Sequence, residues 1–144
     1  MSFRRKADDL RYGLSNERDE KILNAIRSLP FCENIKKHTD RFAIIDYYSD
    51  NALVELKTRK NLNHNQFATG VIGCNKIDEM RRQNLEYNYA VWKYDDGIFY
   101  MRINLDDFVG DRYNKKLMVV RRDTGVERSW VYEIPYGEMI KIEV

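Results

Sequence analysis

Hydrophobic positions recur along the chain with two different spacings, one typical of helices and one typical of strands. Between Ser15 and Leu29, helical spacing relates Ile22, Leu23, Ile26 and Leu29. Ser15 or Asn16 can cap this stretch, acidic residues fill its first turn, and Pro30 follows it. The pattern predicts a helix from Ser15 to Leu29 and then a short strand within residues 33–39.

Residues 42–60 have the pattern of two strands joined by a tight turn, with the sequence FAIIDYYSDNALVELKTRK. If the turn closes symmetrically at Asp50 and Asn51, Asp46 lies directly opposite Glu55. Lys57 lies two residues beyond Glu55 and therefore shares its face. The other face is mostly apolar and is expected to enter a core, with Ala43, Ile45, Val54, Leu56 and Thr58.

Helical spacing returns in residues 65–84, which predicts a second helix. Its apolar positions are Phe67, Val71, Cys74, Ile77 and Met80. A different face carries Gln66, Gly70, Gly73 and Lys76, so it is small in the middle and polar at each end. Each glycine lowers helix stability by roughly 1 kcal/mol relative to alanine. Two explanations stay open: close approach of the helix to a strand or ligand, or ordinary packing on a sheet.

The rest of the chain is rich in strand patterns. They occupy residues 87–94 and 98–103, joined by an Asp-Asp-Gly turn, then residues 117–122, 130–134 and 138–143. Residues 105–113 form a connection or a short helical turn. This order predicts an α/β or α+β fold with a central mixed sheet flanked by helices, in one domain of residues 1–144.

Composition is ordinary for a globular protein, with 43% hydrophobic and 33% charged residues. No apolar run has membrane-spanning length and the first residues lack the apolar core of a signal peptide, so we expect an intracellular protein without a membrane segment. The net charge is only +2, but basic residues are clustered at residues 4–6, 57–60, 115–116 and 121–122. Such clusters are either solvated surface runs or parts of a positive stripe. The spacing of the two cysteines and two histidines does not fit a structural zinc site.

The face that carries Asp46, Glu55 and Lys57 is the strongest candidate for chemistry. Two carboxylates this close repel each other unless a cation lies between them, and oxygen ligands suit a hard ion such as Mg²⁺. A lysine beside the metal can hold a water or neutralise a phosphate. The triplet alone says little, because alternating charge is typical of a solvated strand face. The partner acid across the turn is what favours a metal-dependent phosphodiester hydrolase.

These residues resemble the PD-(D/E)XK nuclease superfamily, which has the restriction-endonuclease-like fold. Residues 13–18, GLSNER, are similar to the start of the acidic helix in resolvase-like members, which makes Glu17 the helix acid. Asp46 matches the strand aspartate, Glu55 and Lys57 match the E-x-K triplet, and Lys76 or Gln66 matches the polar position on the next helix. The segments ELKTR, GCNKI and EIPYGEMIKI are similar to small nuclease-like proteins of phages and large DNA viruses. Ile45 stands where many members have proline.

The resemblance implies a Mg²⁺- or Mn²⁺-dependent deoxyribonuclease, an endonuclease that needs no organic cofactor. Asp46, Glu55 and the Leu56 carbonyl would hold one ion, and Glu17 would reach a second. Lys57 would orient the attacking water, and phosphate contacts would come from Lys76, Arg59, Lys60 and Gln66. Resolvase-like members work as homodimers, so a homodimer is implied as well. Two alternatives stay open: a catalytically silent nucleic-acid-binding or accessory protein with the same fold, and a nuclease directed at RNA.

Overall fold

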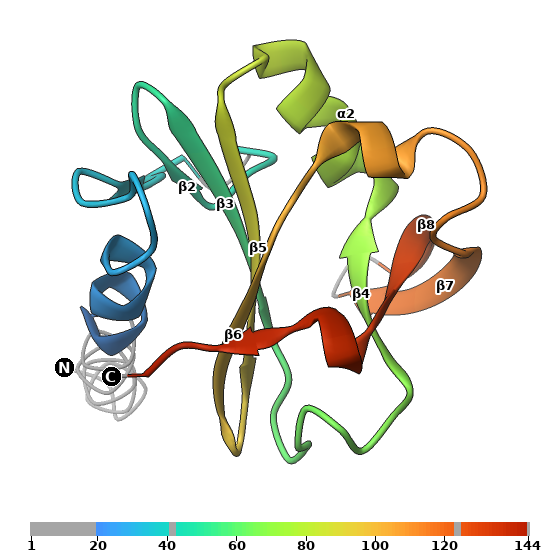
Figure 1. Ribbon diagram of the computed structural model, residues 1–144. Helices are drawn as coiled ribbons and strands as arrows, with labels where there is room; N and C mark the ends of the chain where they lie inside the picture. Colours follow the sequence, from blue (N-terminus) through green and yellow to red (C-terminus); the bar gives the residue numbers. More distant parts are fainter. Residues whose placement is uncertain (1–19, 41–42, 123–124, 144) are drawn as a thin grey trace, which may run out of the picture.

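The computed structural model describes residues 20–40, 43–122 and 125–143, which form an α+β fold (Figure 1). Its larger sheet has six strands in the order β1, β2, β3, β5, β6 and β9, with bounds Lys36–Lys37, Tyr47–Tyr48, Ala52–Thr58, Tyr87–Tyr94, Gly97–Arg102 and Ile140–Lys141. β3 and β5 are parallel, and the other neighbouring pairs are antiparallel. The predicted mixed sheet is therefore confirmed.

A parallel pair of strands needs a crossover connection, and this one contains both a strand and a helix. From β3 the chain passes through β4 (Thr69–Gly73) and α2 (Cys74–Gln83) before it enters β5. β4 pairs with β8 (Gly125–Pro135), which pairs with β7 (Lys115–Arg122), so these strands form a second, antiparallel sheet. Short 3-10 helices cover Leu105–Phe108 and Tyr136–Glu138. In Figure 1, α2 and the second sheet lie on one side of the larger sheet and the helical residues 20–27 on the other.

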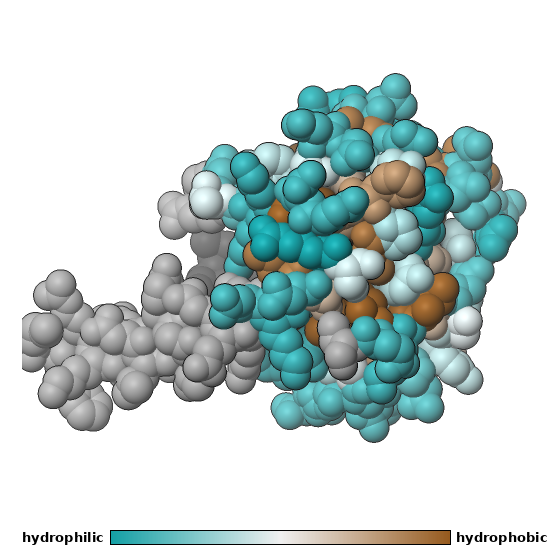
Figure 2. Space-filling model, turned by 60° about the vertical axis from the view of Figure 1, so that its left-hand side comes forward, coloured by the Kyte–Doolittle hydropathy of each residue, from teal (hydrophilic) through white to brown (hydrophobic). Residues whose placement is uncertain are grey.

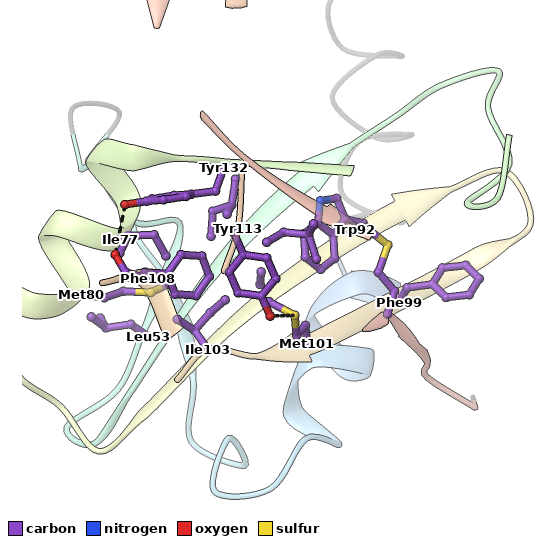
Figure 3. Packing of buried hydrophobic residues seen from close by; sticks show 14 of the residues in the cluster. Leu53, Ile77, Met80, Trp92, Phe99, Met101, Ile103, Phe108, Tyr113 and Tyr132 are labelled. Atoms are coloured by element: carbon purple, nitrogen blue, oxygen red, sulfur yellow. Dashed lines mark hydrogen bonds between the residues drawn. The ribbon is translucent and has the colours of Figure 1, made fainter. Parts of the chain in front are cut away.

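The larger sheet separates two hydrophobic clusters, because side chains along each strand alternate between its faces. On β3, Leu53 belongs to the first cluster, whereas Ala52 and Val54 belong to the second. The first cluster joins the sheet to α2 and the second sheet (Figure 3). The second cluster includes Ile22 and Ile26 from the N-terminal helix.

Two polar groups inside the first cluster have backbone partners. The Trp92 Nε1–H donates to the Val71 carbonyl at 3.0 Å. The Tyr132 hydroxyl donates to the Phe108 carbonyl at 3.4 Å (Figure 3). Trp92 and Tyr132 can be buried here because each finds an acceptor for its polar end.

The predicted helix over residues 65–84 is wrong in its first half. Only Cys74–Gln83 is helical, Thr69–Gly73 is strand β4, and Phe67, expected in the core, is 59% exposed. Glycine at position 70 serves packing between sheets, because a Cβ there would lie 2.5 Å from Met139 Cε and 2.9 Å from the Tyr94 hydroxyl. The glycines and β-branched residues of this segment suit an extended chain better than a helix.

Most other predicted elements are confirmed. The N-terminal helix is seen over residues 20–27 and ends before Pro30, although residues 15–19 lie outside the described part of the chain. The turn from β5 to β6 and the pairing of β7 with β8 occur as expected. Two side chains differ from prediction. Ile45 packs in the first cluster because residues 43–46 bend out of regular strand geometry, and Thr58 is exposed at the end of β3.

The face of the molecule in Figure 2 is mostly hydrophilic, with hydrophobic residues visible between the polar ones. None of the helices within the described ranges is both long and apolar enough to span a bilayer.

Candidate active site

The β2–β3 hairpin brings Asp46 and Glu55 together. Tyr47 pairs with Val54 and Tyr48 with Leu53, so Asp46, just before β2, lies near Glu55, just after Val54, and their side chains share a hydrogen bond. The turn is closed by the Ser49 N–H, which donates to the Ala52 carbonyl at 2.9 Å. The predicted opposition of the two acids is therefore what the structure shows.

Asp46 is held against β3 by the main chain. Its Oδ2 accepts a hydrogen bond of 2.9 Å from the Leu56 N–H. β2 is only two residues long, so this edge of β3 would otherwise lack a partner at Leu56. The expected role of the Leu56 carbonyl as a metal ligand stays a prediction.

Glu55 is 8% exposed and has unusual acid–base properties. Burial raises its pKa to about 9, helped by a hydrogen bond with Asp46 and by the charge of that carboxylate, while Lys76 opposes the shift. At neutral pH the carboxyl group of Glu55 is thus protonated, and its hydrogen bond with Asp46 favours this form.

Lys76 comes to this pair from the first turn of α2. Its Nζ lies 3.1 Å from Glu55 Oε2 and donates a hydrogen bond to the Ile44 carbonyl. The contact with Oε2 is electrostatic and lacks the alignment of a hydrogen bond, so Oε2 is buried without a hydrogen-bond donor in the described structure. A cation near a helix N-terminus opposes the helix dipole by about 0.3–1 kcal/mol, which the adjacent acids offset. No sequence signal pointed to the Ile44 carbonyl, which lies in a bend.

Lys57 lies on the same face of β3 as Glu55. In the parallel pairing, Glu55 is beside Ala90 and Lys57 beside Trp92, and both neighbours belong to the first cluster. Glu55 is buried and Lys57 is exposed, so the strand emerges from the core between them. The ammonium group therefore stands at the solvent side of the buried acids.

The remaining predicted residues lie apart from the pair or outside the described chain. Arg59 and Lys60 follow the end of β3, where the Arg59 N–H donates to the Lys93 carbonyl at 2.8 Å. Gln66 is exposed in the loop between β3 and β4. This loop lies at the opposite end of the larger sheet from α2 (Figure 1). The assignment of Gln66 to a helix beside Glu55 is wrong, because β4 follows this loop. Glu17 falls outside the described residues.

The donor set fits a hydrated divalent ion that binds through two carboxylates. Mg²⁺ commonly uses one or two carboxylates and keeps several waters. A buried carboxyl oxygen of Glu55 without a hydrogen bond, beside a second acid, is a place where a cation could replace the proton of Glu55. Within residues 20–40, 43–122 and 125–143, no cluster of three or more His, Cys, Asp or Glu side chains could hold a metal. Asp46 and Glu55 would therefore hold an ion as a pair, with water as its other ligands.

Comparison of the chain with protein-family models, curated proteins and solved structures found no significant match.

Proposed function

We propose that this protein is a metal-dependent nuclease of the PD-(D/E)XK type that hydrolyses phosphodiester bonds in DNA. The observation that carries the proposal is the pairing of Asp46 with Glu55 across the hairpin, with Lys76 of α2 at 3.1 Å from Glu55. A surface ion pair needs neither a second acid nor a protonated partner. A site built to exchange a proton for a metal ion uses both.

The order of elements supports the same proposal. A helix precedes the hairpin with its aspartate, the E-x-K strand β3 follows, and α2 carries the polar Lys76. The chain then returns as β5, parallel to β3. This is the order in which the restriction-endonuclease-like fold presents its functional residues, and we propose that core for this chain.

In the proposed mechanism, Asp46 and the ionised form of Glu55 would hold one Mg²⁺ or Mn²⁺. Such an ion would supply an activated water and neutralise charge on the phosphoryl oxygens. Asp46 keeps its orientation because the Leu56 amide holds Oδ2. Glu17, which lies outside the described residues, is proposed as a further acid of this site.

Basic residues would have the remaining roles in the reaction. Lys57, at the solvent side of Glu55, would orient the attacking water or offset charge in the transition state. Lys76 would contact the scissile phosphate, giving up part of its interaction with Glu55 when the substrate binds. Arg59 and Lys60 would contact phosphates farther along the strand from the end of β3.

A cleavage assay with matched variants tests the proposal. Glu55→Gln should lower the rate of Mg²⁺- or Mn²⁺-dependent cleavage of supercoiled, branched and single-stranded DNA by about 100-fold or more. Glu79→Gln is the control, because Glu79 is also 8% exposed but lies on α2, bound to Arg82. Equal rates in both variants, or activity of the parent in excess EDTA, would show that the site is elsewhere.

A second candidate function rests on Lys76. Its ammonium group already lies beside the coupled acids and can neutralise them without a metal, as in a silent nucleic-acid-binding or accessory protein that keeps the fold. This candidate predicts DNA binding without cleavage at any Mg²⁺ or Mn²⁺ concentration.

A further inference from the structure

In the second sheet, β7 and β8 extend beyond the end of β4. β4 pairs with β8 only from Val131 to Pro135, so the earlier part of β8 pairs with β7 alone. Residues 117–122 and 125–130 thus pair only with each other, as a two-stranded ribbon. This ribbon with Lys115 and Lys116 at its base, within residues 115–130, is here called the β7–β8 arm. A two-stranded ribbon has two open faces and gains little stability by itself.

One face of the arm is apolar and open. Leu117 pairs with Trp130 and Val119 with Arg128, so these four side chains and Val126 share a face. Leu117 is 42% exposed, Val119 59%, Val126 65% and Trp130 56%. Immediately after the arm, Val131 and Tyr132 are buried, so the exposure begins where β4 ends. Solvent-exposed tryptophan in a run of exposed aliphatic residues indicates a binding surface.

The arm is also the most basic part of the chain. Residues 115–130 contain five basic residues, Lys115, Lys116, Arg121, Arg122 and Arg128, against the acids Asp123 and Glu127. The arm therefore carries a net charge of +3, while the whole chain carries +2. The excess positive charge is concentrated in this ribbon, which makes it suited to a polyanion.

The charge argues against a second copy of the chain as the occupant. Two such arms placed face to face would oppose equal positive charges, and Arg128 interrupts the apolar strip between Val126 and Trp130. An exposed aromatic ring among cations instead matches the way proteins bind unpaired nucleic acid, in which bases stack on aromatic side chains and cations follow the backbone. Duplex DNA hides its base faces and offers Trp130 no stacking partner.

The base of the arm lies next to the helix that carries Lys76. Lys115 is close enough to Cys74, the first residue of α2, for its charge to oppose the rise in the Cys74 pKa that burial causes. Cys74 and Lys76 are in the same helical turn. A nucleic-acid strand that passes Lys76 can thus continue over the start of α2 to the arm.

We propose that the β7–β8 arm binds an unpaired segment of DNA, with a base stacked on Trp130 and the backbone held by Lys115 and Arg128, which lie on the same face as Trp130. The choice of DNA as the nucleic acid rests on the proposed function, whereas binding by the arm does not depend on cleavage. The proposal gives the protein a preference for DNA that is single-stranded, branched or frayed near the cleaved bond.

Fluorescence anisotropy of the full chain with labelled oligonucleotides in EDTA tests this without cleavage. Trp130→Ala should weaken binding to a single-stranded oligonucleotide by about 5-fold to 100-fold and leave duplex binding nearly unchanged. Arg128→Ala should reduce the salt dependence of single-strand binding by about 0.7 in the slope of log K against log salt. Phe67→Ala is the matched control, because Phe67 is an exposed aromatic residue outside the arm, and thermal melts establish that each variant is folded.

Single-strand affinity that is the same for Trp130→Ala and the parent would overturn the proposal, and so would an equal loss with duplex. A parent dimer in sedimentation velocity that Val119→Lys separates, with DNA affinity unchanged, would assign the face to a second copy instead. If the parent never cleaves DNA but its binding of single strands depends on Trp130, the nuclease proposal is contradicted and the proposal about the arm is supported. If the parent cleaves DNA and Trp130→Ala binds single strands as tightly as the parent, only the proposal about the arm is contradicted.

Discussion

Two glutamates of this protein have the same exposure and opposite acid–base behaviour. Glu55 on β3 and Glu79 on α2 are each 8% exposed, but the pKa of Glu55 is raised to about 9 and that of Glu79 is lowered. Glu79 is covered by its own helix neighbours: Arg82 and Gln83 both donate to it, and the Arg82 side chain is 71% exposed. Glu55 is covered by the protein interior and faces another acid.

Loss of exposed area therefore does not by itself shift a carboxyl pKa upward. What matters is whether the atoms that exclude water can stabilise the charge. Glu79 has exchanged water for hydrogen-bond donors, so its ionised form is favoured. Glu55 has exchanged water for hydrocarbon and a competing carboxylate, and one lysine does not compensate. This is the difference between an acid that holds a helix together and an acid available for chemistry.

The largest expected effect is on the pH dependence of stability without metal. The folded-state pKa of Glu55, about 9, lies above its ordinary value of 4.5, so the proton stabilises the fold fully below pH 4.5, and this stability is lost as pH rises through about 9. Urea unfolding of the parent in EDTA should show the free energy of unfolding falling by several kcal/mol across this range, on the order of 1.4 kcal/mol for each pH unit between the two pKa values. Glu55→Gln should remove most of this slope, whereas a parent with the same slope as Glu55→Gln would contradict the assigned pKa.

Metal binding should then depend steeply on pH. Each ion that binds Asp46 and Glu55 must displace one proton, so affinity should rise by about tenfold per pH unit below the pKa of Glu55. Isothermal titration with Mn²⁺ in buffers of different ionisation enthalpy measures both the affinity and the proton release. Asp46→Asn should lose the binding altogether. A proton release near zero would mean that the ion binds to other groups.

A smaller difference in stability is expected between variants that lack the basic partner of each glutamate, Lys76 for Glu55 and Arg82 for Glu79. Lys76→Ala leaves the Ile44 carbonyl without its donor and takes away the ammonium group that lies against Glu55, so it should lower stability by about 1–3 kcal/mol. Arg82→Ala removes an exposed side chain and should lower stability less. Thermal unfolding of both variants makes the comparison, and an equal or larger loss for Arg82→Ala would reverse our interpretation of the two sites.

The smallest expected effect is the contribution of Glu79 to the pH dependence of stability, which has the opposite sign to that of Glu55. Its folded-state pKa is lowered, chiefly by the hydrogen bond from Arg82, so its contribution to stability is present above its ordinary pKa of 4.5 and is lost as pH falls further. Glu79→Gln should differ from the parent at neutral pH and converge with it in acid. Denaturation midpoints measured across the acid range would show this, and a difference that grows toward low pH would be inconsistent with it.

The hairpin and its pair of acids could be predicted from sequence because the causes are local. A short polar turn between two alternating segments sets the register, and that register decides which side chains face each other. Thus Asp46 and Glu55 were placed correctly without knowledge of the rest of the fold. The side chain of Ile45 was misplaced for an equally local reason, a bend that the alternating pattern does not reveal.

Residues 66–73 show where such reasoning fails. Their apolar spacing suits a helix, but β4 is stabilised by β8, where Gly70 pairs with Ile134, and by contact with Met139. These partners are far along the chain, and nothing local indicates them. The approach of Lys76 to Glu55 was expected from spacing along a longer helix. The lysine reaches that position on a shorter helix that β4 positions, so the placement agrees although part of the reasoning behind it was wrong.

The pairing of β4 with β8 also has a consequence for the order in which the protein becomes functional during its synthesis. β4 lies between β3 and α2, so the helix that delivers Lys76 cannot take its final position until residues 131–135 have left the ribosome and formed the second sheet. Pairings between such distant segments form late and slowly. The acids of the hairpin can meet early, but the lysine joins them only after residues 131–135 have been made. A nascent chain that lacks these residues would thus carry no assembled site.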